Sequence, residues 1–443
     1  MRTMLQVALA LLLAAPVTGQ QEDGFFPFDY RLVELENGFK AYLIKAGAPG
    51  QIAYVSMVRT GSRDEVEPGK SGFAHFFEHM MFRGTQKYPN YDSVTSEIGA
   101  ARNAFTSNDY TIYYLVTSKE YLELIVDLES DRFRNLNYDE PGFRTEAGAV
   151  LGEYMQSAAT PFRFLDEKVR EVAYDRHTYR HTTIGFEEDV RAMPEAYDYS
   201  LTFYRRFYRP ENVVLVLAGD IDYEETQALI EEYYGGWEAG YVPPQITPEP
   251  TQRSARRRTV RFQGRTLPVL SVNYKAPSWS AGDRLAVAME VLGEVAFGSN
   301  SDIYKKLVIE ERRLQFLSGD FGLARDPALA SVTAMVIDPA DVTAVEQEIQ
   351  GTVNRFHQDL VDERLFADTK SNMKYGFLMG LETAQNVAFA MMPYVINTSG
   401  IEAVNEYYRT LDALTRDDLR EAARRYLVDS GKTVVTMVQA GGE

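Results

Sequence analysis

Alternating hydrophobic and polar residues predict several strands. Residues 30–45 alternate on both sides of Asn37-Gly38, a pair typical of a hairpin turn. Residues 53–59 predict another strand, and residues 213–218 are apolar throughout, as in a buried strand. Residues 103–116 are rich in Thr, Tyr and Phe without a helical period, which predicts a long strand that turns near Asn108-Asp109.

Other segments have the spacing of amphipathic helices. We expect a helix over residues 72–83, with Ser71 as its N-cap and Gly84 as its C-terminal stop. The same periodicity predicts helices over residues 119–134, 142–157, 162–173 and 223–234. Helices and strands therefore alternate along the chain.

The domain organisation follows from length and from one proline-rich stretch. A chain of 443 residues predicts two or three domains. Four prolines between residues 243 and 250 predict a stiff, extended linker. We therefore expect an N-terminal domain over residues 22–240, a linker over 241–252 and a C-terminal domain over 253–443. Residues 207–216 and 425–436 share the pattern of a helix end, a turn and a buried strand, a weak sign of duplication.

The first 19 residues have the pattern of a secretory signal peptide. Arg2 precedes an apolar run from Leu5 to Ala15, and Val17-Thr18-Gly19 offers small residues near a cleavage site. An uncleaved N-terminal anchor is the alternative. The run is shorter than the roughly 20 residues that span a bilayer, and no later segment predicts a transmembrane helix. We expect an exported protein, periplasmic or secreted.

Composition excludes some classes of function. The formal net charge is −18, which disfavours binding to nucleic acid. The one basic cluster, residues 253–258, lacks interleaved aromatic residues, and we interpret it as the solvated start of a strand. The chain has no cysteine, so disulfides and cysteine-ligated metal sites are impossible.

Two of the five histidines form a candidate metal site. His75 and His79 are four residues apart on one expected helix and share a face, with Glu78 at its edge. Zinc catalysis needs a third protein ligand. Glu153 lies in a largely apolar stretch where burial of a carboxylate is costly unless it is paired, so we expect it to be that ligand, with Glu146 orienting a ligand. The helical spacing by itself is also compatible with two histidines that bind no metal. A second site at His177 and His181 is disfavoured because those residues fall in a loop.

The sequence around these residues resembles the pitrilysin and mitochondrial-processing-peptidase family. Residues 72–85 contain the inverted motif His75-Phe76-Phe77-Glu78-His79 and resemble the active-site helix of that family. Residues 103–106, which are Asn103, Ala104, Phe105 and Thr106, resemble its substrate-binding strand. The resemblance is specific over residues 30–222 and diffuse beyond residue 243. It implies an α+β fold of two tandem homologous half-domains, each a mostly antiparallel sheet with helices on one face.

The resemblance also implies a function and a missing component. It predicts a zinc metalloendopeptidase with Glu78 and Glu146 in catalytic roles, which cleaves peptides or unfolded segments. Active relatives carry an Arg and, seven residues later, a Tyr in the second half, where this chain has Ile309 and Phe316. We therefore expect a homologous, zinc-less partner that supplies both groups, in preference to a homodimer. A weaker lone enzyme, a structural subunit, a binding module without turnover, and manganese or cobalt in place of zinc remain alternatives.

Overall fold

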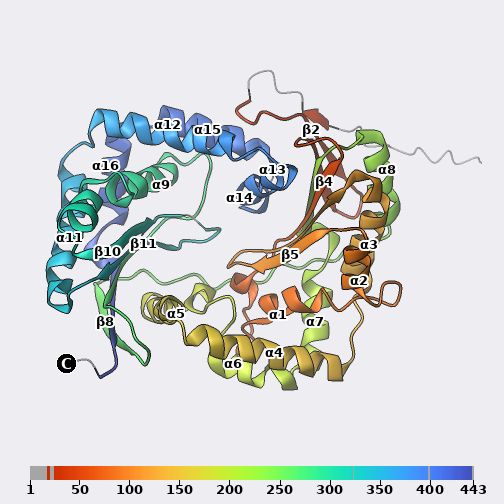
Figure 1. The fold of residues 1–443 in the computed structure, drawn as a ribbon, viewed down its shortest axis with the longest axis horizontal. Coiled ribbons are helices and arrows are strands. Elements are labelled where there is room, and N and C mark those ends of the chain that lie inside the picture. Colours follow the sequence, from red (N-terminus) through yellow and green to blue (C-terminus); the bar gives the residue numbers. More distant parts are fainter. Residues whose placement is uncertain (1–16, 20–23, 323, 398–399, 442–443) are drawn as a thin grey trace, which may run out of the picture.

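The chain forms two β-sheets, one from each half (Figure 1). The computed structural model describes residues 17–19, 24–322, 324–397 and 400–441. Most of the expected signal peptide, residues 1–16, therefore lies outside the described residues. Strand β1 (Val17–Gly19), at the end of that segment, pairs with β2 (Tyr30–Glu34).

The first sheet has seven strands in the order β1-β2-β3-β7-β4-β6-β5, so that β5 is an edge strand. Neighbouring strands are antiparallel except for β3 and β7. The turns expected at Asn37-Gly38 and Asn108-Asp109 join β2 to β3 and β5 to β6, as predicted. The remaining strands are β3 (Lys40–Lys45), β4 (Gln51–Val58), β5 (Ala101–Thr106), β6 (Thr111–Ser118) and β7 (Val213–Gly219).

Apart from α5, the helices of the first half gather on one face of this sheet, where they share a buried core with the inward residues of its strands. Periodicity predicted the longer helices but missed α2, α6 and α7, of which two are short and the third is built largely from Tyr, Phe and Arg. The helices are α1 (Phe73–Met80), α2 (Tyr91–Glu97), α3 (Leu122–Asn135), α4 (Glu140–Ala158), α5 (Pro161–Ala173), α6 (Glu187–Ala192), α7 (Tyr197–Phe207) and α8 (Tyr223–Tyr234).

The second sheet repeats the topology of the first. Its order β10-β11-β9-β12-β8 matches β5-β6-β4-β7-β3, and its single parallel pair, β12 with β8, falls at the same place. The two tandem homologous halves expected from the resemblance are therefore present. The strands are β8 (Arg256–Phe262), β9 (Val269–Lys275), β10 (Leu314–Asp320), β11 (Leu329–Val336) and β12 (Lys432–Gln439).

The helices of the second half follow the same chain order. Helix α9 comes after β9 and before the β10–β11 hairpin, as α1 comes after β4 and before the β5–β6 hairpin. By the same argument α12 corresponds to α4, and α13 corresponds to α5. The helices are α9 (Arg284–Phe297), α10 (Asp302–Tyr304), α11 (Val342–Gln358), α12 (Glu363–Met379), α13 (Ala384–Ala390), α14 (Met392–Asn397), α15 (Glu402–Ala413) and α16 (Arg416–Tyr426).

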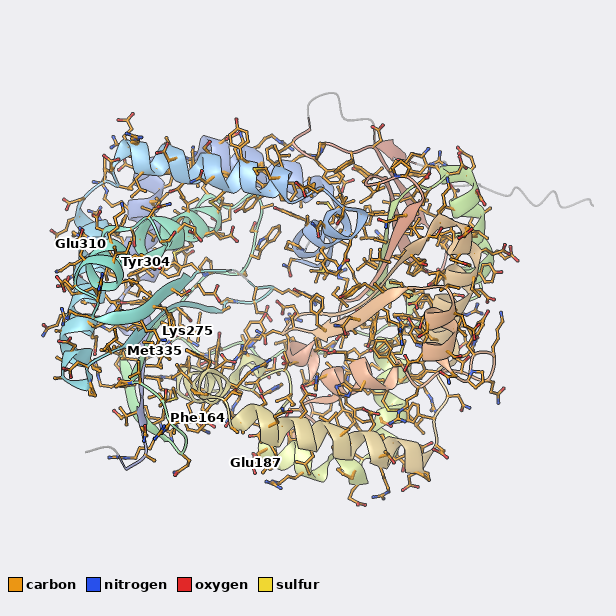
Figure 2. The ribbon with its side chains drawn as sticks, viewed as in Figure 1. Phe164, Glu187, Lys275, Tyr304, Glu310 and Met335 are labelled. Atoms are coloured by element: carbon orange, nitrogen blue, oxygen red, sulfur yellow. The ribbon has the colours of Figure 1, made fainter. Side chains whose placement is uncertain are left out.

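In each half, one helix packs against the sheet of the other half. Helix α5 packs on β8 and β12, where the rings of Phe164 and Phe262 lie 5.6 Å apart and Met335 of β11 borders the same cluster (Figure 2). Helix α13 packs on β4 and β7 of the first sheet (Figure 1). One face of each sheet is therefore covered by helices of the same half. The opposite face is covered by the helix that comes from the other half. This exchange buries apolar area between the halves and ties them together.

The segment between the halves is extended, and the basic cluster lies beside it. Residues 241–252 contain no helix or strand, and Glu249 accepts backbone N–H bonds from residues 175–177. The arginines of β8 pair with acids: Arg256 with Asp175, Arg257 with Glu346 and Arg258 with Glu171. The cluster is thus the start of a strand, as expected.

One bent helix pair stands out for its apolar character. Within the described residues no single helix is long and apolar enough to cross a bilayer, but Ala384–Asn397 and Glu402–Ala413, bent by 87°, together meet the criteria of length and composition. Part of the pair is α13, which packs on the first sheet.

Candidate metal centre

Helix α1 is positioned at its N-terminus by a buried carboxylate. Its N-cap is Gly72, with φ of 93°, where an added Cβ would lie 2.4 Å from the Ile184 carbonyl oxygen. The side chain of Glu65 accepts N–H bonds from Gly72 at 2.7 Å and Ala74 at 2.6 Å. These two bonds satisfy N–H groups that the first turn leaves free. Burial raises the pKa of Glu65 well above its ordinary value, although the two N–H bonds oppose this shift.

Ser71, the expected N-cap, has a different role. Its hydroxyl donates to Asp189 at 2.6 Å and accepts from the backbone N–H of Phe186 at 2.8 Å, so it fixes the start of α6 instead. The prediction was wrong because it considered only residues adjacent to the helix. Nothing in the local sequence marks Glu65, seven positions before Gly72, as the capping group.

The end of α1 is also earlier than predicted. The helix stops at Met80, and residues 81–83 continue in a tighter turn in which the N–H of Arg83 bonds to the carbonyl of Met80 at 2.9 Å. Gly84 follows with φ of 92°, a conformation that favours glycine. Both histidines remain within the regular helix.

His75, His79 and Glu153 converge. One ligand atom from each lies within 4.8 Å of the others. Nε2 of His75 and Nε2 of His79 lie 3.6 and 3.4 Å from Oε2 of Glu153. In a tetrahedral site with bonds of about 2.1 Å, ligand atoms are about 3.4 Å apart, so the spacing fits one zinc ion. The buried Nδ1 of His75 has no hydrogen-bond partner among the described residues.

Helix α4 supplies both acidic side chains of the site. Asp139 caps the helix through the N–H of Gly142 at 2.9 Å, and Glu146 and Glu153 lie two turns apart on one face. The Glu153 side chain is 46% exposed, so the burial expected from its apolar neighbours in sequence is not found. It is the most exposed of the three side chains, since His75 is 11% and His79 is 27% exposed.

Glu146 contacts the ring nitrogen of His79 that faces away from Glu153. Its Oε1 lies 2.9 Å from Nδ1 of His79, and its other oxygen pairs with Arg83. A carboxylate on the distal ring nitrogen fixes the ring orientation and leaves Nε2 free as a ligand. The position agrees with the orienting role expected for Glu146.

Glu78 lies beside the cluster and contacts the edge strand. Its Oε2 accepts the Thr106 hydroxyl at 2.7 Å. Burial raises the pKa of Glu78, which moves this carboxylate toward the range in which a general base works near neutral pH. The acid is therefore held between the metal cluster and β5.

The two histidines have opposite electrostatic surroundings. Burial lowers the pKa of His75 to about 4, whereas hydrogen bonds to Glu146 and Glu153 raise the pKa of His79 to about 9. The same bond from His79 lowers the pKa of Glu153. Because metal ligands must be deprotonated, metal uptake would displace a proton from His79.

The four expected substrate-binding residues on β5 divide by their contacts. Asn103 is exposed on the edge strand, and its side chain accepts the N–H of Ala104 at 2.9 Å. Thr106 contacts Glu78, as described. Ala104 is buried against α1, and Phe105 packs on Phe389 of α13, with ring centroids 6.2 Å apart. Their side chains thus have packing roles, whereas the outer edge of β5 faces no neighbouring strand.

His177 and His181 do not converge. His177 Nε2 lies 2.9 Å from Asp326, and its Nδ1 accepts the N–H of Tyr179. His181 Nδ1 contacts the carbonyl of Thr182 at 3.0 Å. Within the described residues, only His75, His79 and Glu153 bring three candidate ligand atoms close enough to hold one ion.

Comparisons with known proteins identify a family. The family described as insulinase (peptidase family M16) matches residues 43–186, and the peptidase M16 inactive domain matches residues 196–373. The zinc protease PqqE of Helicobacter pylori is 26% identical over 416 residues, covering 91% of each chain. The mitochondrial-processing peptidase subunit beta of Bos taurus is 24% identical over 421 residues, covering 92% of this chain and 84% of that one.

Among solved structures, a protease from Helicobacter pylori has the same fold. Its TM-score is 0.87 at 24% identity, and the match covers 92% of this chain and 99% of that chain. The first family region lies within the first half and contains the candidate metal cluster, whereas the second region runs from α7 of the first half to α12 of the second. This chain belongs to peptidase family M16, the insulinase and pitrilysin family, whose named relatives include zinc proteases.

Proposed function

We propose that this chain is an exported zinc metalloendopeptidase that hydrolyses peptides or unfolded segments. The observation that carries the proposal is the convergence of His75, His79 and Glu153 beside a buried carboxylate, Glu78. Two nitrogen donors and one exposed carboxylate match the three protein ligands of a catalytic zinc site, which leaves the fourth position open. Family membership supports the same reaction class.

Each polar residue of the site has a distinct task in this proposal. A bound zinc ion lowers the pKa of a coordinated water to about 7 and polarises a carbonyl group. Glu78 accepts a proton from the attacking water and donates it to the leaving amine. Glu146 holds the His79 ring, and Thr106 orients Glu78 through its hydrogen bond.

Strand β5 is the proposed substrate-binding element. It is an edge strand, and an extended peptide can add to such an edge through backbone hydrogen bonds, which depend little on the amino-acid sequence of the peptide. Residues 103–106 would supply those backbone groups, with Asn103 placed to orient the peptide. Folded proteins lack a free extended segment, so unfolded chains are the expected substrates.

A homologous partner subunit would complete the site. Ile309 is exposed after α10, and Phe316 of β10 packs on Phe162 with ring centroids 5.5 Å apart. Neither side chain can donate a hydrogen bond to a developing oxyanion, as the Arg and Tyr of active relatives do. We expect a zinc-less relative to supply these groups, and the signal-like pattern of residues 1–19 supports export.

The test combines metal analysis with one peptide assay. The chain is purified alone and together with a homologue that lacks the metal motif, and each sample is assayed with a quenched fluorescent peptide. We expect about one zinc per chain and cleavage that a chelator abolishes. Absence of zinc would overturn the proposal, and full activity of the isolated chain would remove the need for a partner.

A further inference from the structure

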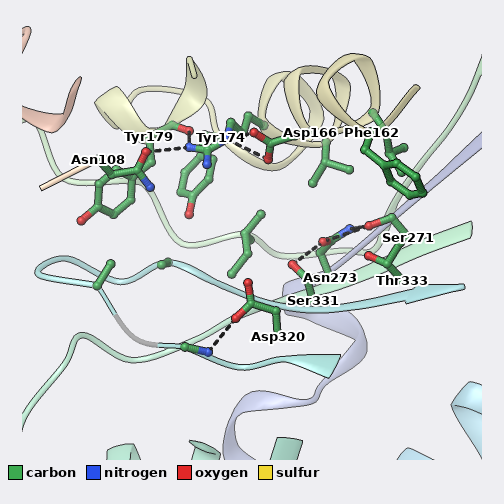
Figure 3. Close-up of a pocket in the computed structure, with 17 residues that line it drawn as sticks. Asn108, Phe162, Asp166, Tyr174, Tyr179, Ser271, Asn273, Asp320, Ser331 and Thr333 are labelled. Carbon is green, nitrogen blue, oxygen red and sulfur yellow. Dashed lines mark hydrogen bonds and ion pairs between the residues drawn. The ribbon is translucent and has the colours of Figure 1, made fainter. Parts of the chain in front are cut away.

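A polar cavity lies between α5 and the second sheet. It has a volume of about 420 Å³, within the range typical of ligand pockets (Figure 3). Its floor consists of side chains of β9 and β11: Ser271, Asn273, Ser331 and Thr333. Its roof is one face of α5 and includes Phe162, Asp166 and Arg170.

The corresponding contact in the first half has a different chemistry. There α13, the counterpart of α5, packs on Val55 and Met57 of β4, and the buried residues around it are apolar. The shared topology therefore does not require hydroxyl and amide side chains beneath an exchanged helix. Burial of such groups is costly unless they are hydrogen-bonded, so the polar floor needs another explanation.

Most groups of the cavity already pair with one another. Asn273 accepts the Ser331 hydroxyl at 2.7 Å and donates to Ser271 at 3.1 Å. On α5, Nε of Arg170 donates to both oxygens of Asp166 at 2.9 and 3.0 Å. These bonds hold the floor and the roof in fixed orientations, which favours a preorganised site.

Two hydroxyls of the lining remain without a hydrogen bond among the described residues. Tyr174 is only 4% exposed and lines the cavity, and its ring is fixed by the Lys275 ammonium 3.6 Å from the ring centroid. The Thr333 hydroxyl lines the same space from β11 (Figure 3). Thr333 is half-buried, and a hydroxyl that lines a cavity without a protein partner is available to a ligand.

The cavity continues the line of strand β5. Asn108 lines it and lies two residues after Thr106, which contacts Glu78, so the two positions are at most about 7 Å apart along the chain. At the other wall, Phe162 lines the cavity from the first turn of α5, which only two residues separate from the end of α4, the helix that carries Glu153. A peptide on the edge of β5 would therefore reach the cavity beyond the metal centre.

We propose that this cavity binds a segment of the peptide substrate distant from the scissile bond, and that it prefers uncharged polar side chains such as Ser, Thr, Asn and Gln. The inference rests on the proposed peptidase function. The free hydroxyls supply hydrogen bonds to such a segment. Asp320 lines the cavity, and the positive charge of Arg170 is already paired with Asp166. An acidic segment would therefore be repelled.

Peptide binding to the full chain tests the proposal. The zinc-loaded Glu78→Gln variant, which cannot turn over, is titrated with two labelled peptides that share six central residues. One peptide ends there, and the other carries seven further Ser, Asn and Gln residues at each end. We expect the long peptide to bind at least about tenfold more tightly by fluorescence anisotropy, as two or more added hydrogen bonds allow.

Three variants locate that advantage. Thr333→Trp fills the cavity and should abolish the advantage of the long peptide. Tyr174→Phe keeps the ring and should reduce that advantage by about threefold to tenfold. Thr259→Trp makes the same change on an exposed position of β8 and should preserve it. Equal binding of both peptides, or an advantage that survives Thr333→Trp, would overturn the inference.

Failure of the proposed function has a separate signature. If the unsubstituted chain, assayed with its partner, holds zinc but cleaves neither peptide, the peptidase assignment fails. The anisotropy difference between the two peptides still reports on the cavity in that case, because it does not depend on turnover.

Discussion

The two halves of this protein share a topology and differ in chemistry at one helix. Helix α1 presents His75, Glu78 and His79, whereas its counterpart α9 (Arg284–Phe297) contains no histidine and presents Glu290 and Glu294 to a cavity of about 390 Å³. The counterpart of α4, helix α12, lines that cavity with Thr369, Asn372 and Met373. The fold alone therefore does not create a metal centre, because the donors must come from particular positions on two packed helices.

Loss of the Glu78 carboxylate should produce the largest difference between the halves. Glu78→Gln is expected to lower the rate of peptide hydrolysis by about 10²–10⁴-fold, because the amide cannot accept the proton of the attacking water. Zinc content, measured by atomic absorption, should be unchanged. The matched change Glu294→Gln on α9 should leave the rate as it is. Cleavage by Glu78→Gln at the original rate would refute the role of this residue.

Removal of a metal ligand should have the next largest effect. Glu153→Gln replaces a charged ligand by a neutral one, and we expect zinc affinity to fall by at least about 100-fold, beyond the range typical for outer partners of a site. A titration against a competing chelator measures this change. Glu290→Gln, on the helix of the second half, should not alter zinc affinity. A similar loss in both variants would mean that the halves do not differ as described.

The cap of α1 should contribute less, and mainly to stability. Glu65→Ala leaves two N–H groups of the first turn unpaired, and we expect a loss of about 2 kcal/mol in the free energy of unfolding. Zinc affinity should also fall because the histidine helix loosens. Glu188→Ala, at an exposed position of α6, should change the free energy by less than about 0.5 kcal/mol. Equal effects of the two substitutions in urea unfolding would exclude the capping role.

The pH dependence of stability should also distinguish the second half. Burial raises the pKa of Glu290 to about 7, against 4.5 for the ordinary carboxyl, and the Tyr407 hydroxyl partly opposes this shift. The folded state therefore binds the proton more tightly, so the contribution of Glu290 is complete below about pH 4.5 and falls as pH rises to about 7.

We expect this fall to amount to about 2 kcal/mol, reduced from the full shift because the side chain borders an open cavity. Glu290→Gln should abolish that part of the pH dependence. Unfolding measured at several pH values checks this expectation. A curve for the variant that parallels the original protein would show that Glu290 is not the titrating group.

Local sequence patterns predicted much of the first half because the relevant signals lie close together in the chain. Asn37-Gly38 specifies a turn by its own backbone preference, and His75 and His79 share a face because of the helix repeat alone. The choice of Glu153 rested on its apolar neighbours in sequence, although its side chain is exposed and not buried as expected. In the second half weaker similarity gave only the layout, and the repeated strand order became clear in the structure.

The sequence by itself determined the helical spacing of the two histidines, the acidic charge and the absence of cysteine. Tertiary structure alone decided that Glu65 caps α1, that α5 and α13 exchange sheets, and that Tyr174 and Thr333 face one cavity. Short-range features are fixed by backbone preferences of adjacent residues. Contacts between distant residues depend on which surfaces bury the most apolar area while satisfying their polar groups, and no local pattern records that choice.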